Sequence, residues 1–439
     1  MSHKQHKQHK QIVMEVLEAA LKAADPYTAV RDALLATDIE CSGKIYVVGA
    51  GKAGAAMSRA VEEVLGDRIA RGLVVIKDGH AANEETSLRY IELTEASHPL
   101  PDHRGVEASD RIMAIAAQAC SEDLIICLIS GGGSALLTAP RSGITLEELQ
   151  STTRLLLHSG ATINEMNAVR KHLSAISGGQ LAQAASPARL LALIISDVTG
   201  SPLDVIASGP TTPDPTTYRD ALNVLERYSI VSQVPAAVLT MLRRGAAGEL
   251  SETPKPGDEL FKRVENRVVA DNVLAVEAAI ARAHVLGLHS IIMSTYLEGE
   301  AREVGIVLAS IAKEVKTHGR PVQPPGCVIF GGETTVTVKG QGVGGRNTEL
   351  ALGAALALEG WGPDTIVASL ATDGGDGASP GAGAIADGTS VERGRAIGLD
   401  AVAHLKNNDS YPFWSALGDA IHTGPTGTNV NDVMAVFVF

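Results

Sequence analysis

The sequence predicts an α/β protein with an N-terminal Rossmann-like parallel-sheet domain and a smaller C-terminal mixed α/β domain. Short apolar runs that end in Gly, Ser or Asp alternate with amphipathic stretches, and this alternation is typical of parallel strands joined by helices. Hydrophobic residues make up 45% of the chain and aromatic residues only 3%, so the core must be built mainly from Ala, Val, Leu and Ile. Because 439 residues exceed the size of one ordinary core, two domains are expected.

Runs rich in Val, Ile and Leu indicate where the strands lie. In the first half, strands are predicted at 44–51, 72–79, 124–133 and 190–198, and helices at 53–65 and 106–119. In the second half, helices are predicted at 273–286 and 347–358 and strands at 289–295, 327–340 (or a hairpin), 365–377 and 431–439. Ligands of parallel sheets bind beyond the carboxyl ends of the strands, so chemistry is expected at the glycine-rich strand ends.

Local composition predicts the domain boundaries. The first eleven residues repeat His-Lys-Gln, and we expect 1–11 to be a disordered tail or a tag, with a metal-binding tract as the alternative. The polar stretch SETPKPGDE at 251–259 is the best linker candidate. The predicted domains are therefore 12–250 and 251–439.

Charge and cysteine usage restrict the class of function. The formal net charge is −13, which argues against nucleic acid or an anionic membrane as the main partner, because both select basic surfaces. The four cysteines show no CxxC or zinc spacing, as expected in a reducing compartment. No apolar run reaches the ~18 residues of a membrane span and no signal peptide is evident, so a cytoplasmic location is expected.

The glycine loop GAGKAG at 49–54 is predicted to bind an anion. It lies between a strand and a helix, where glycines such as Gly51 let a ligand approach the backbone and the helix N-terminus offers N–H donors. Lys52 lies inside the loop, where a cation would meet phosphate or carboxylate directly. The GxGxxG spacing also suits NAD, and Asp78 lies about where a ribose-binding acid would be, although Lys77 precedes it. A tight turn with an exposed lysine is the alternative without function.

A second anion-binding loop is predicted at SGGGSA, residues 130–135. Gly131, Gly132 and Gly133 follow an apolar strand and leave successive backbone N–H groups uncovered, which makes an anion nest. Ser134 is expected to cap the next helix. The motif lacks the Lys-Ser/Thr ending of a P-loop, so a Walker-type fold is not expected, and a flexible loop is the alternative.

Two further segments of the first half carry polar side chains suited to catalysis. Asn167, Arg170, Lys171 and Ser174 fall at helical spacings of three and four, so they can share one face. A solvated helix face explains the same pattern equally well. Asp197 ends a strongly apolar strand, where a carboxylate can bind magnesium, act as a general base, or cap a turn.

Three glycine-rich loops stand out in the second half. They are GGET at 331–334, GVGGRNTE at 342–349 and TDGGDG at 372–377. The third carries two carboxylates but does not fit EF-hand spacing, so structural calcium explains it poorly. Each loop by itself could be a simple turn. Five glycine-rich loops in one chain, several with a charged residue, favour a binding function.

Ten motifs, taken in order, resemble those of the glycerate 2-kinases that carry a C-terminal MOFRL domain. They are VGAGKA, HPLPD, SGGGSALL, NAVRKHLS, ISDV, SGPTTPDP, GGETTVTV, GGRNTELAL, TDGGDG and TGTNVND. The resemblance extends from about residue 12 to the end of the chain. It implies a Rossmann-like domain followed by a MOFRL domain at about 325–439, with the active site in the cleft between the domains.

The resemblance also implies a reaction and some of its residues. The implied enzyme transfers the γ-phosphoryl group of ATP to the 2-hydroxyl of D-glycerate, giving 2-phosphoglycerate and ADP with Mg²⁺. Lys52 and Arg346 look like the central cations, and Asp197 looks like the acidic partner of the hydroxyl or the metal. Asp373 is the alternative carboxylate.

The remaining candidate residues follow from the same loops. Those expected to bind substrate or phosphate are Gly51, Gly131, Gly132, Gly133, Ser134, Asn167, Arg170 and Lys171, with Arg170 or Lys171 for the carboxylate of glycerate. Those expected to bind the nucleotide are Gly332, Glu333, Thr334, Gly345, Asn347, Asp373 and Asn429. Asp197 and Asp373 are the candidate metal ligands.

Two other functions are compatible with the sequence. A nicotinamide-dependent hydroxypyruvate reductase would explain GAGKAG and Asp78, but it lacks an obvious partnered catalytic histidine other than His98. A non-catalytic nucleotide or phosphosugar sensor would need the same glycine loops. The expected partners are D-glycerate and ATP, with no nucleic acid and no membrane, and a homodimer is a possible assembly.

Overall fold

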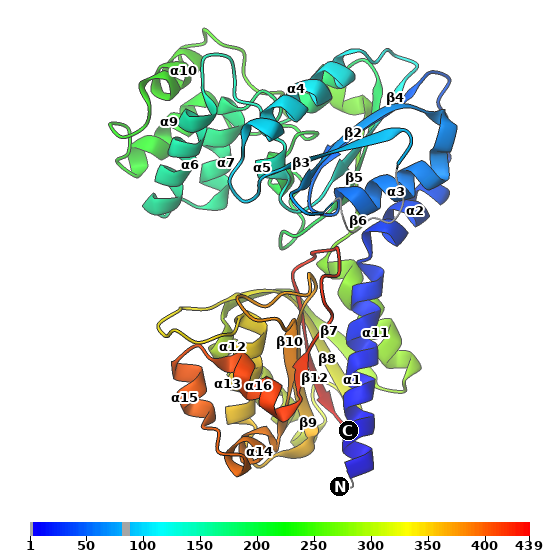
Figure 1. Cartoon of the computed structure of the whole chain (residues 1–439), viewed down its shortest axis with the longest axis vertical. Helices are drawn as coiled ribbons and strands as arrows, with labels where there is room; N and C mark the ends of the chain where they lie inside the picture. The colour runs from blue at the N-terminus through cyan, green and yellow to red at the C-terminus, as the bar shows by residue number, and fades with distance from the viewer. Residues whose placement is uncertain (1–2, 81–87) are drawn as a thin grey trace. The chain divides into compact units, whose positions relative to one another are not determined.

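The computed structural model describes residues 3–80 and 88–439 and divides into two compact units. One unit is Pro26–Val269, and the other combines Met1–Asp25 with Ala270–Phe439. Each unit contains one six-stranded sheet with helices packed against it (Figure 1). Here we call them the 26–269 unit and the 270–439 unit. No helix among the described residues is long and apolar enough to cross a membrane.

The sheet of the 26–269 unit has the strand order β3-β2-β1-β4-β5-β6. Its strands are β1 (Ile45–Ala50), β2 (Ile69–Lys77), β3 (Ile91–Ala96), β4 (Leu124–Ile129), β5 (Arg189–Ile195) and β6 (Val264–Ala270). The four neighbouring pairs from β3 to β5 are all parallel. This is the doubly wound order, in which the chain reverses direction across the sheet between β1 and β4. The predicted Rossmann-like fold is confirmed.

Helices cover both faces of this sheet, as the apolar strands require. On one face, α4 (His103–Ala117) and α8 (Gln180–Ala185) pack on side chains such as Leu73, Val75 and Ile125. On the other, α3 (Gly54–Leu65) packs on Val74 and Ile76, following α2 (Pro26–Leu35). Short elements complete the unit: α5 (Gly133–Leu136) and the 3₁₀ turns Gly66–Arg68, Ile206–Ser208 and Glu259–Arg263.

The strands β3 and β6 were not among the predicted strands. Both lie at the edges of the sheet, and β3 reads IELTEA with only its two ends buried. An edge strand with one wet face carries charged residues, so its apolar content is too low to stand out in the sequence. β6 is only partly buried for the same reason.

Four helices build a separate apolar cluster beside this sheet. They are α6 (Leu146–Ser159), α7 (Ile163–Leu173), α9 (Tyr218–Arg227) and α10 (Ala236–Ala246). Three of them begin with a capping box, at Thr145, Thr162 and Thr217. Such boxes satisfy two orphan N–H groups at the first turn, so the starts of these helices are defined by local sequence.

The 270–439 unit is mixed α/β, as predicted. Its sheet runs β11-β10-β9-β12-β8-β7, with only the pair β7–β8 parallel. The strands are β7 (His289–Glu300), β8 (Gly326–Thr335), β9 (Gly362–Ala371), β10 (Gly383–Gly388), β11 (Ala420–Ile421) and β12 (Asp432–Val438). The helices are α1 (His3–Ala23), α11 (Asn272–Val285), α12 (Ala301–His318), α13 (Arg346–Ala357), α14 (Ser390–Ala396), α15 (Ala401–Lys406) and α16 (Ser410–Leu417).

The predicted disorder of the N-terminal tail is wrong for the residues that the structure describes, because residues from His3 onward form the first turns of α1. His6 Nε2 lies 2.9 Å from the buried Asp387 carboxylate, Lys10 pairs with Asp419, and the ring of His9 stacks 3.9 Å from that of Phe439. These contacts attach α1 to the 270–439 unit. The His-Lys-Gln repeat therefore has specific partners far along the chain, which its composition could not reveal.

The predicted domain boundary also differs from the observed division. The stretch 251–259 belongs to the 26–269 unit, where Thr253 is buried and donates to Asp214 at 2.9 Å. Glu252 accepts from the backbone N–H of Tyr218 at 3.1 Å. The unit changes at 269/270 instead. A polar, proline-containing stretch indicates a linker only when its polar groups are not used in tertiary hydrogen bonds.

Candidate functional site

Two predicted glycine loops meet at the carboxyl ends of β1 and β4. The backbone N–H of Lys52 donates to the carbonyl of Gly131 at 2.9 Å, and Ala53 N–H donates to Ser130 Oγ at 3.1 Å. In the opposite direction, Ser130 N–H donates to the carbonyl of Ala50 at 3.2 Å. The doubly wound topology places its ligand site at this switch point, so the loops predicted separately form one site.

The glycines of these loops are required by their backbone and packing. Gly132 has φ +85°, and a Cβ there would lie 3.0 Å from the ring of His98. Gly54 begins α3, where a Cβ would lie 2.9 Å from the side chains of Val74 and Ile76. Glycine at 132 therefore allows an open turn that suits an anion, and glycine at 54 allows the helix to pack closely on the sheet. Both are known roles of glycine in this fold.

A cavity of about 530 Å³ opens from the 130–135 loop. One part of its wall consists of that loop with His98, Arg170 and Asp197. The rest is mainly apolar and comes from the 99–101 segment, α6 and α7. The cavity lies within the 26–269 unit. It therefore joins a polar, glycine-rich end to an apolar slot.

Lys52 and Asp197 both adjoin the 130–135 glycine loop. A Cβ at Gly132 would lie 3.4 Å from Lys52 Cγ, so the lysine stem runs along that glycine. A Cβ at Gly131 would lie 2.3 Å from Asp197 Oδ2, so the carboxylate packs against its neighbour. Among the described residues, the Lys52 ammonium has no recorded ion pair. The loop thus has a cation and a carboxylate on it, as transfer of an anionic group requires.

The imidazole of His98 lies in the wall of this cavity, and its pKa is lowered by its surroundings. The pKa is lowered to about 4, mainly by burial and then by the positive charges of Lys52, Lys77 and His80. The ring is therefore neutral at pH 7. A hydride transfer to a ketone needs an acid to protonate the oxygen, and a neutral His98 is a poor donor for that step.

The carboxylate of Asp78 is paired with an arginine. Arg104 Nη1 and Nη2 donate to its two carboxylate oxygens at 2.7 and 2.8 Å, and this hydrogen bonding lowers the pKa of Asp78. A ribose-binding acid must offer those oxygens to the sugar hydroxyls. The structure thus gives no support to the nicotinamide site that Asp78 suggested.

Two predicted side chains, Ser134 and Asn167, are linked beside the nest through Ser208, which was not predicted. Ser134 Oγ lies 3.0 Å from Ser208 Oγ, and Ser208 Oγ donates to Asn167 Oδ1 at 3.2 Å. Arg170 Nη2 donates to the carbonyl of Ser134 at 3.4 Å, and burial lowers the pKa of this arginine. Ser134 is not the helix cap that we predicted, because α5 begins after Gly132 without a side-chain cap. It instead links the nest to α7.

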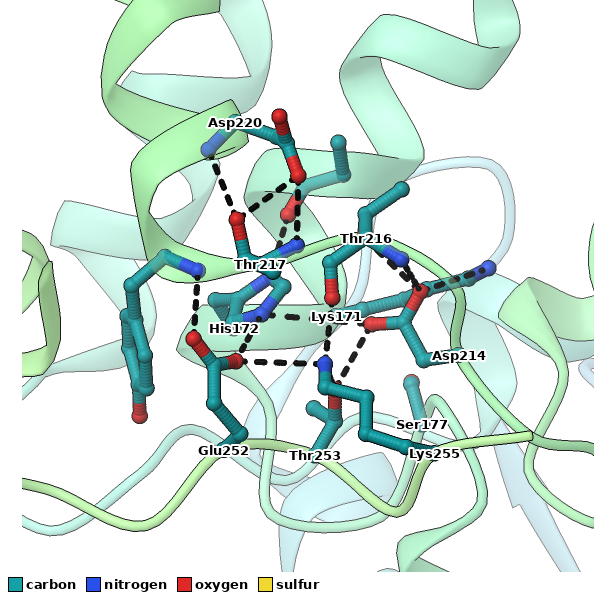
Figure 2. Close-up of polar contacts among 12 residues, drawn as sticks. Lys171, His172, Ser177, Asp214, Thr216, Thr217, Asp220, Glu252, Thr253 and Lys255 are labelled. Atoms are coloured by element: carbon teal, nitrogen blue, oxygen red, sulfur yellow. Dashed lines mark hydrogen bonds and ion pairs between the residues drawn. The ribbon is translucent and has the colours of Figure 1, made fainter. Parts of the chain in front are cut away.

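Lys171 does not reach the cavity. Its side chain is 2% exposed, and Nζ lies 3.4 Å from Asp204 Oδ2 and 3.5 Å from Asp214 Oδ1. Figure 2 shows it in a polar network with His172, whose Nε2 lies 3.0 Å from Glu252 Oε2. Consecutive helical residues point about 100° apart. Of the two candidates for an anion, Arg170 therefore faces the cavity and Lys171 the interior.

Arg346 lies in the 270–439 unit, at the start of α13, between two carboxylates. Its Nε and Nη2 donate to Asp432 at 2.5 and 3.0 Å, and its Nη1 donates to Glu333 at 2.6 Å. Burial raises the pKa of Asp432 to about 6, and the arginine opposes that rise. Three of the five N–H groups of the guanidinium are thus used within the protein.

Several predicted nucleotide ligands of this unit have structural partners. Asn347 is buried, where Oδ1 accepts from Ser369 Oγ at 2.5 Å. The carboxylate of Asp376 accepts from the N–H groups of Asn347 and Thr348 at 2.9 and 2.8 Å, so it caps α13 from the TDGGDG loop. Gly345 packs against it, since a Cβ would lie 2.4 Å from Asp376 Oδ1. Thr334 is also buried.

The other three predicted nucleotide residues lie at or near the same end of the sheet. Asp373 is exposed and accepts from Gly375 N–H at 3.0 Å. Asn429 Oδ1 accepts from Asn431 N–H at 3.1 Å, as in a turn. Gly332 pairs with Asp432 across β8 and β12, and a Cβ there would lie 2.2 Å from the carbonyl of Leu297. Each of these three residues therefore has a structural role that does not require a bound nucleotide.

Some residues at these sites were missed by sequence reasoning. Asp432 was quoted only as the end of TGTNVND, and its pairing with Arg346 bridges 86 positions of sequence. The cavity-lining residues of α6 form an ordinary amphipathic pattern, so nothing local distinguished them. Among the described residues, no group of three His, Cys, Asp or Glu could hold a metal ion.

Comparisons with known proteins cover both units. A family model described as "Domain of unknown function (DUF4147)" matches residues 12–243, and the MOFRL family model matches residues 326–432. A glycerate 2-kinase of Pyrococcus horikoshii is 42% identical, over 97% of this chain and 97% of that protein. A putative hydroxypyruvate reductase of Agrobacterium vitis is 44% identical, over 97% of this chain and 94% of that protein.

A solved structure extends the likeness to three dimensions. The crystal structure of a glycerate kinase from Thermotoga maritima matches with a TM-score of 0.91 at 42% identity, over 99% of this chain and 100% of that one. Identity of this level over nearly the full length confirms the family predicted from the ordered motifs. The chain belongs to the glycerate 2-kinase family with a C-terminal MOFRL region.

Proposed function

We propose that this protein transfers the γ-phosphoryl group of ATP to the 2-hydroxyl of D-glycerate, giving 2-phosphoglycerate and ADP. The observation that carries the proposal is the paired glycine loop with Lys52 and Asp197 at the sheet switch point. Relatives named glycerate 2-kinase support the choice of substrate and of position 2. Phosphoryl transfer needs positioning and positive charge rather than a covalent intermediate, and this site offers both.

The roles follow from charge and position. The glycine loop and the Lys52 ammonium hold the transferring phosphoryl group, whose equatorial oxygens carry negative charge. Asp197 orients the 2-hydroxyl and accepts its proton as the new oxygen–phosphorus bond forms. The bond to the β-phosphate oxygen breaks, and its electron pair leaves with ADP.

Magnesium fits this site through a single carboxylate. Mg²⁺ retains several waters and is usually held by one or two carboxylates together with substrate phosphates, so a cluster of three protein ligands is not required. Asp197 would hold it where the metal, rather than the hydroxyl, is the partner of this carboxylate, which packs against the 130–135 loop. The ion would supply charge neutralisation on the phosphate oxygens. Asp373 belongs to the other unit, and it stays a prediction.

We also keep Arg346 as a proposed phosphate ligand. Two of its five N–H groups are not used by Asp432 or Glu333. The buried Asp432 holds the guanidinium plane by two hydrogen bonds, so its direction is set before any anion binds. A preorganised arginine is well suited to an oxyanion.

The carboxylate of glycerate is assigned to Arg170. We expect Arg170→Met to raise the KM for glycerate about 10- to 100-fold, because a hydrogen bond to a charged group contributes roughly 1.5–3 kcal/mol. The KM for ATP should change less than threefold. Initial rates at varied glycerate and fixed saturating ATP measure this.

Arg219→Met is the matched control, since Arg219 is exposed on α9 and does not line the cavity. Its kinetic constants should equal those of the wild type. A larger effect of Arg170→Met on the KM for ATP than for glycerate would move this arginine to the nucleotide.

The reaction itself is tested by identifying its product. Purified protein with ATP, MgCl₂ and D-glycerate should give a ³¹P resonance of 2-phosphoglycerate, and the product should be consumed by enolase without a mutase. A product consumed only after a mutase is added would indicate phosphorylation at position 3. Oxidation of NADH with hydroxypyruvate, without phosphoglycerate formation, would establish the reductase instead.

A further inference from the structure

The cavity described above is larger and more apolar than glycerate needs. Its volume is about 530 Å³, and away from the glycine loop its wall includes Leu100, Leu149, Leu157, Ile163 and Met166, together with the polar Gln150, Thr153 and Arg154 of α6. Glycerate has only three carbons, each of which carries oxygen, so no part of it is matched to an apolar wall. A second ligand group must account for this half of the cavity.

Two helices shape this apolar slot. Leu149 and Leu157 lie eight residues apart on α6, and Ile163 and Met166 lie three apart on α7, so each pair shares a helix face. The two helices pack against each other (Figure 1). Each pair lines the same cavity. The slot therefore has two apolar walls, which is the shape that a flat ring fills.

The rim of the slot leaves large apolar side chains in contact with water. Leu100, Leu157 and Ile163 are 59%, 56% and 48% exposed. Clustered exposed apolar residues beside a pocket mark ligand-binding surfaces more often than chance exposure. Arg154, one turn before Leu157 on α6, is exposed on the same wall and has no recorded hydrogen bond or ion pair among the described residues. A guanidinium in that place can stack on an aromatic ring.

We propose that the slot between α6 and α7 binds the purine base of the nucleotide, with the base against Leu157 and Ile163. The proposal rests on the proposed function, which requires a nucleoside triphosphate and glycerate. Of these two substrates, only the nucleotide has a flat part with an apolar face. The slot is continuous with the glycine loop, so one molecule spans both, with phosphates at the loop and base in the slot.

This assignment changes where the nucleotide is expected to bind. The sequence predicted nucleotide contacts on loops of the 270–439 unit, where Asn347 and Gly345 have structural partners instead and Thr334 is buried. The slot lies wholly in the 26–269 unit. Base recognition would then belong to the helices α6 and α7.

The test measures ADP affinity in variants of exposed slot residues. In the full chain with MgCl₂, Leu157→Ser and Ile163→Ser should each weaken ADP binding about five- to tenfold by titration calorimetry, because burying half of such a side chain is worth roughly 1 kcal/mol. Both side chains are half exposed, so the melting temperature should stay within a few degrees of the wild type. Leu35→Ser is the matched control, as Leu35 is 67% exposed at the end of α2.

Inorganic tripolyphosphate, which has no base, separates the slot from the phosphate loop. Its affinity should be the same in the wild type and in both slot variants. Unchanged ADP affinity in Leu157→Ser and Ile163→Ser would overturn the proposal, and so would equal weakening of ADP and tripolyphosphate. Failure of the wild type to form phosphoglycerate would reject the proposed function, while slot-dependent ADP binding would still establish the base site.

Discussion

Lys52→Ala should lower kcat by about a hundred- to a thousandfold while leaving the fold intact. The ammonium lies beside Gly132 at the anion loop, where it meets charge that develops during transfer. Loss of one preorganised contact of this kind costs about 3–4 kcal/mol in the transition state. The Lys52 side chain has no recorded ion pair among the described residues, so the melting temperature should change little. Steady-state kinetics and thermal unfolding measure the two effects.

Three controls define that result. Lys52→Arg should restore activity only in part, because a planar guanidinium does not replace a compact ammonium in a tight loop. Lys77→Ala removes another charge felt by His98 and should cost at most a few-fold in kcat. The pKa of His98, followed by NMR, should rise in Lys52→Ala. If Lys52→Ala retains more than a tenth of the wild-type kcat/KM, the loss of transition-state stabilisation is below about 1.4 kcal/mol. Lys52 would then have no role in catalysis.

Lys171→Met should instead act on stability, with a loss of about 3 kcal/mol or more. Asp214 is fully buried, and removing its cation leaves a charge uncompensated in the interior, which typically costs 3–5 kcal/mol. Hydrogen bonds from Thr216 and Thr253 to Asp214 remain and place the loss at the lower end. Urea unfolding measures the change, which corresponds to several degrees in Tm.

The partner residue and a surface pair test this explanation. Adding Asp214→Asn to Lys171→Met should recover part of the stability, because it removes the unpaired charge. Lys262→Met breaks an exposed pair with Glu259 and should change stability by less than about 1 kcal/mol. Lys171→Met could instead keep wild-type stability and raise the KM for glycerate. That result would show that Lys171 binds the substrate, as the sequence first suggested.

The central strands of the first sheet, the glycine loops and the family could be predicted from the sequence alone. The strands β1, β4 and β5 are continuous apolar runs, and such runs are buried in any parallel sheet. Glycine clusters at strand ends are visible in the sequence, so the loops around Gly54 and Gly132 could be located, although the groups that require glycine there, such as Val74 and His98, are distant along the chain. The predicted anion site at Lys52 depended on this local information, together with the order of the motifs.

The tertiary structure decided the partner of each charged side chain. Lys171 and Arg170 are neighbours in sequence, but one pairs with Asp214 and the other lines the cavity. Asp376 caps α13 and Asp78 binds Arg104. The His-Lys-Gln repeat forms a helix through contacts with residues more than 380 positions away. The sequence does not distinguish a carboxylate that binds a ligand from one that pairs with a buried cation. The difference depends on which distant segment of the chain packs against the carboxylate.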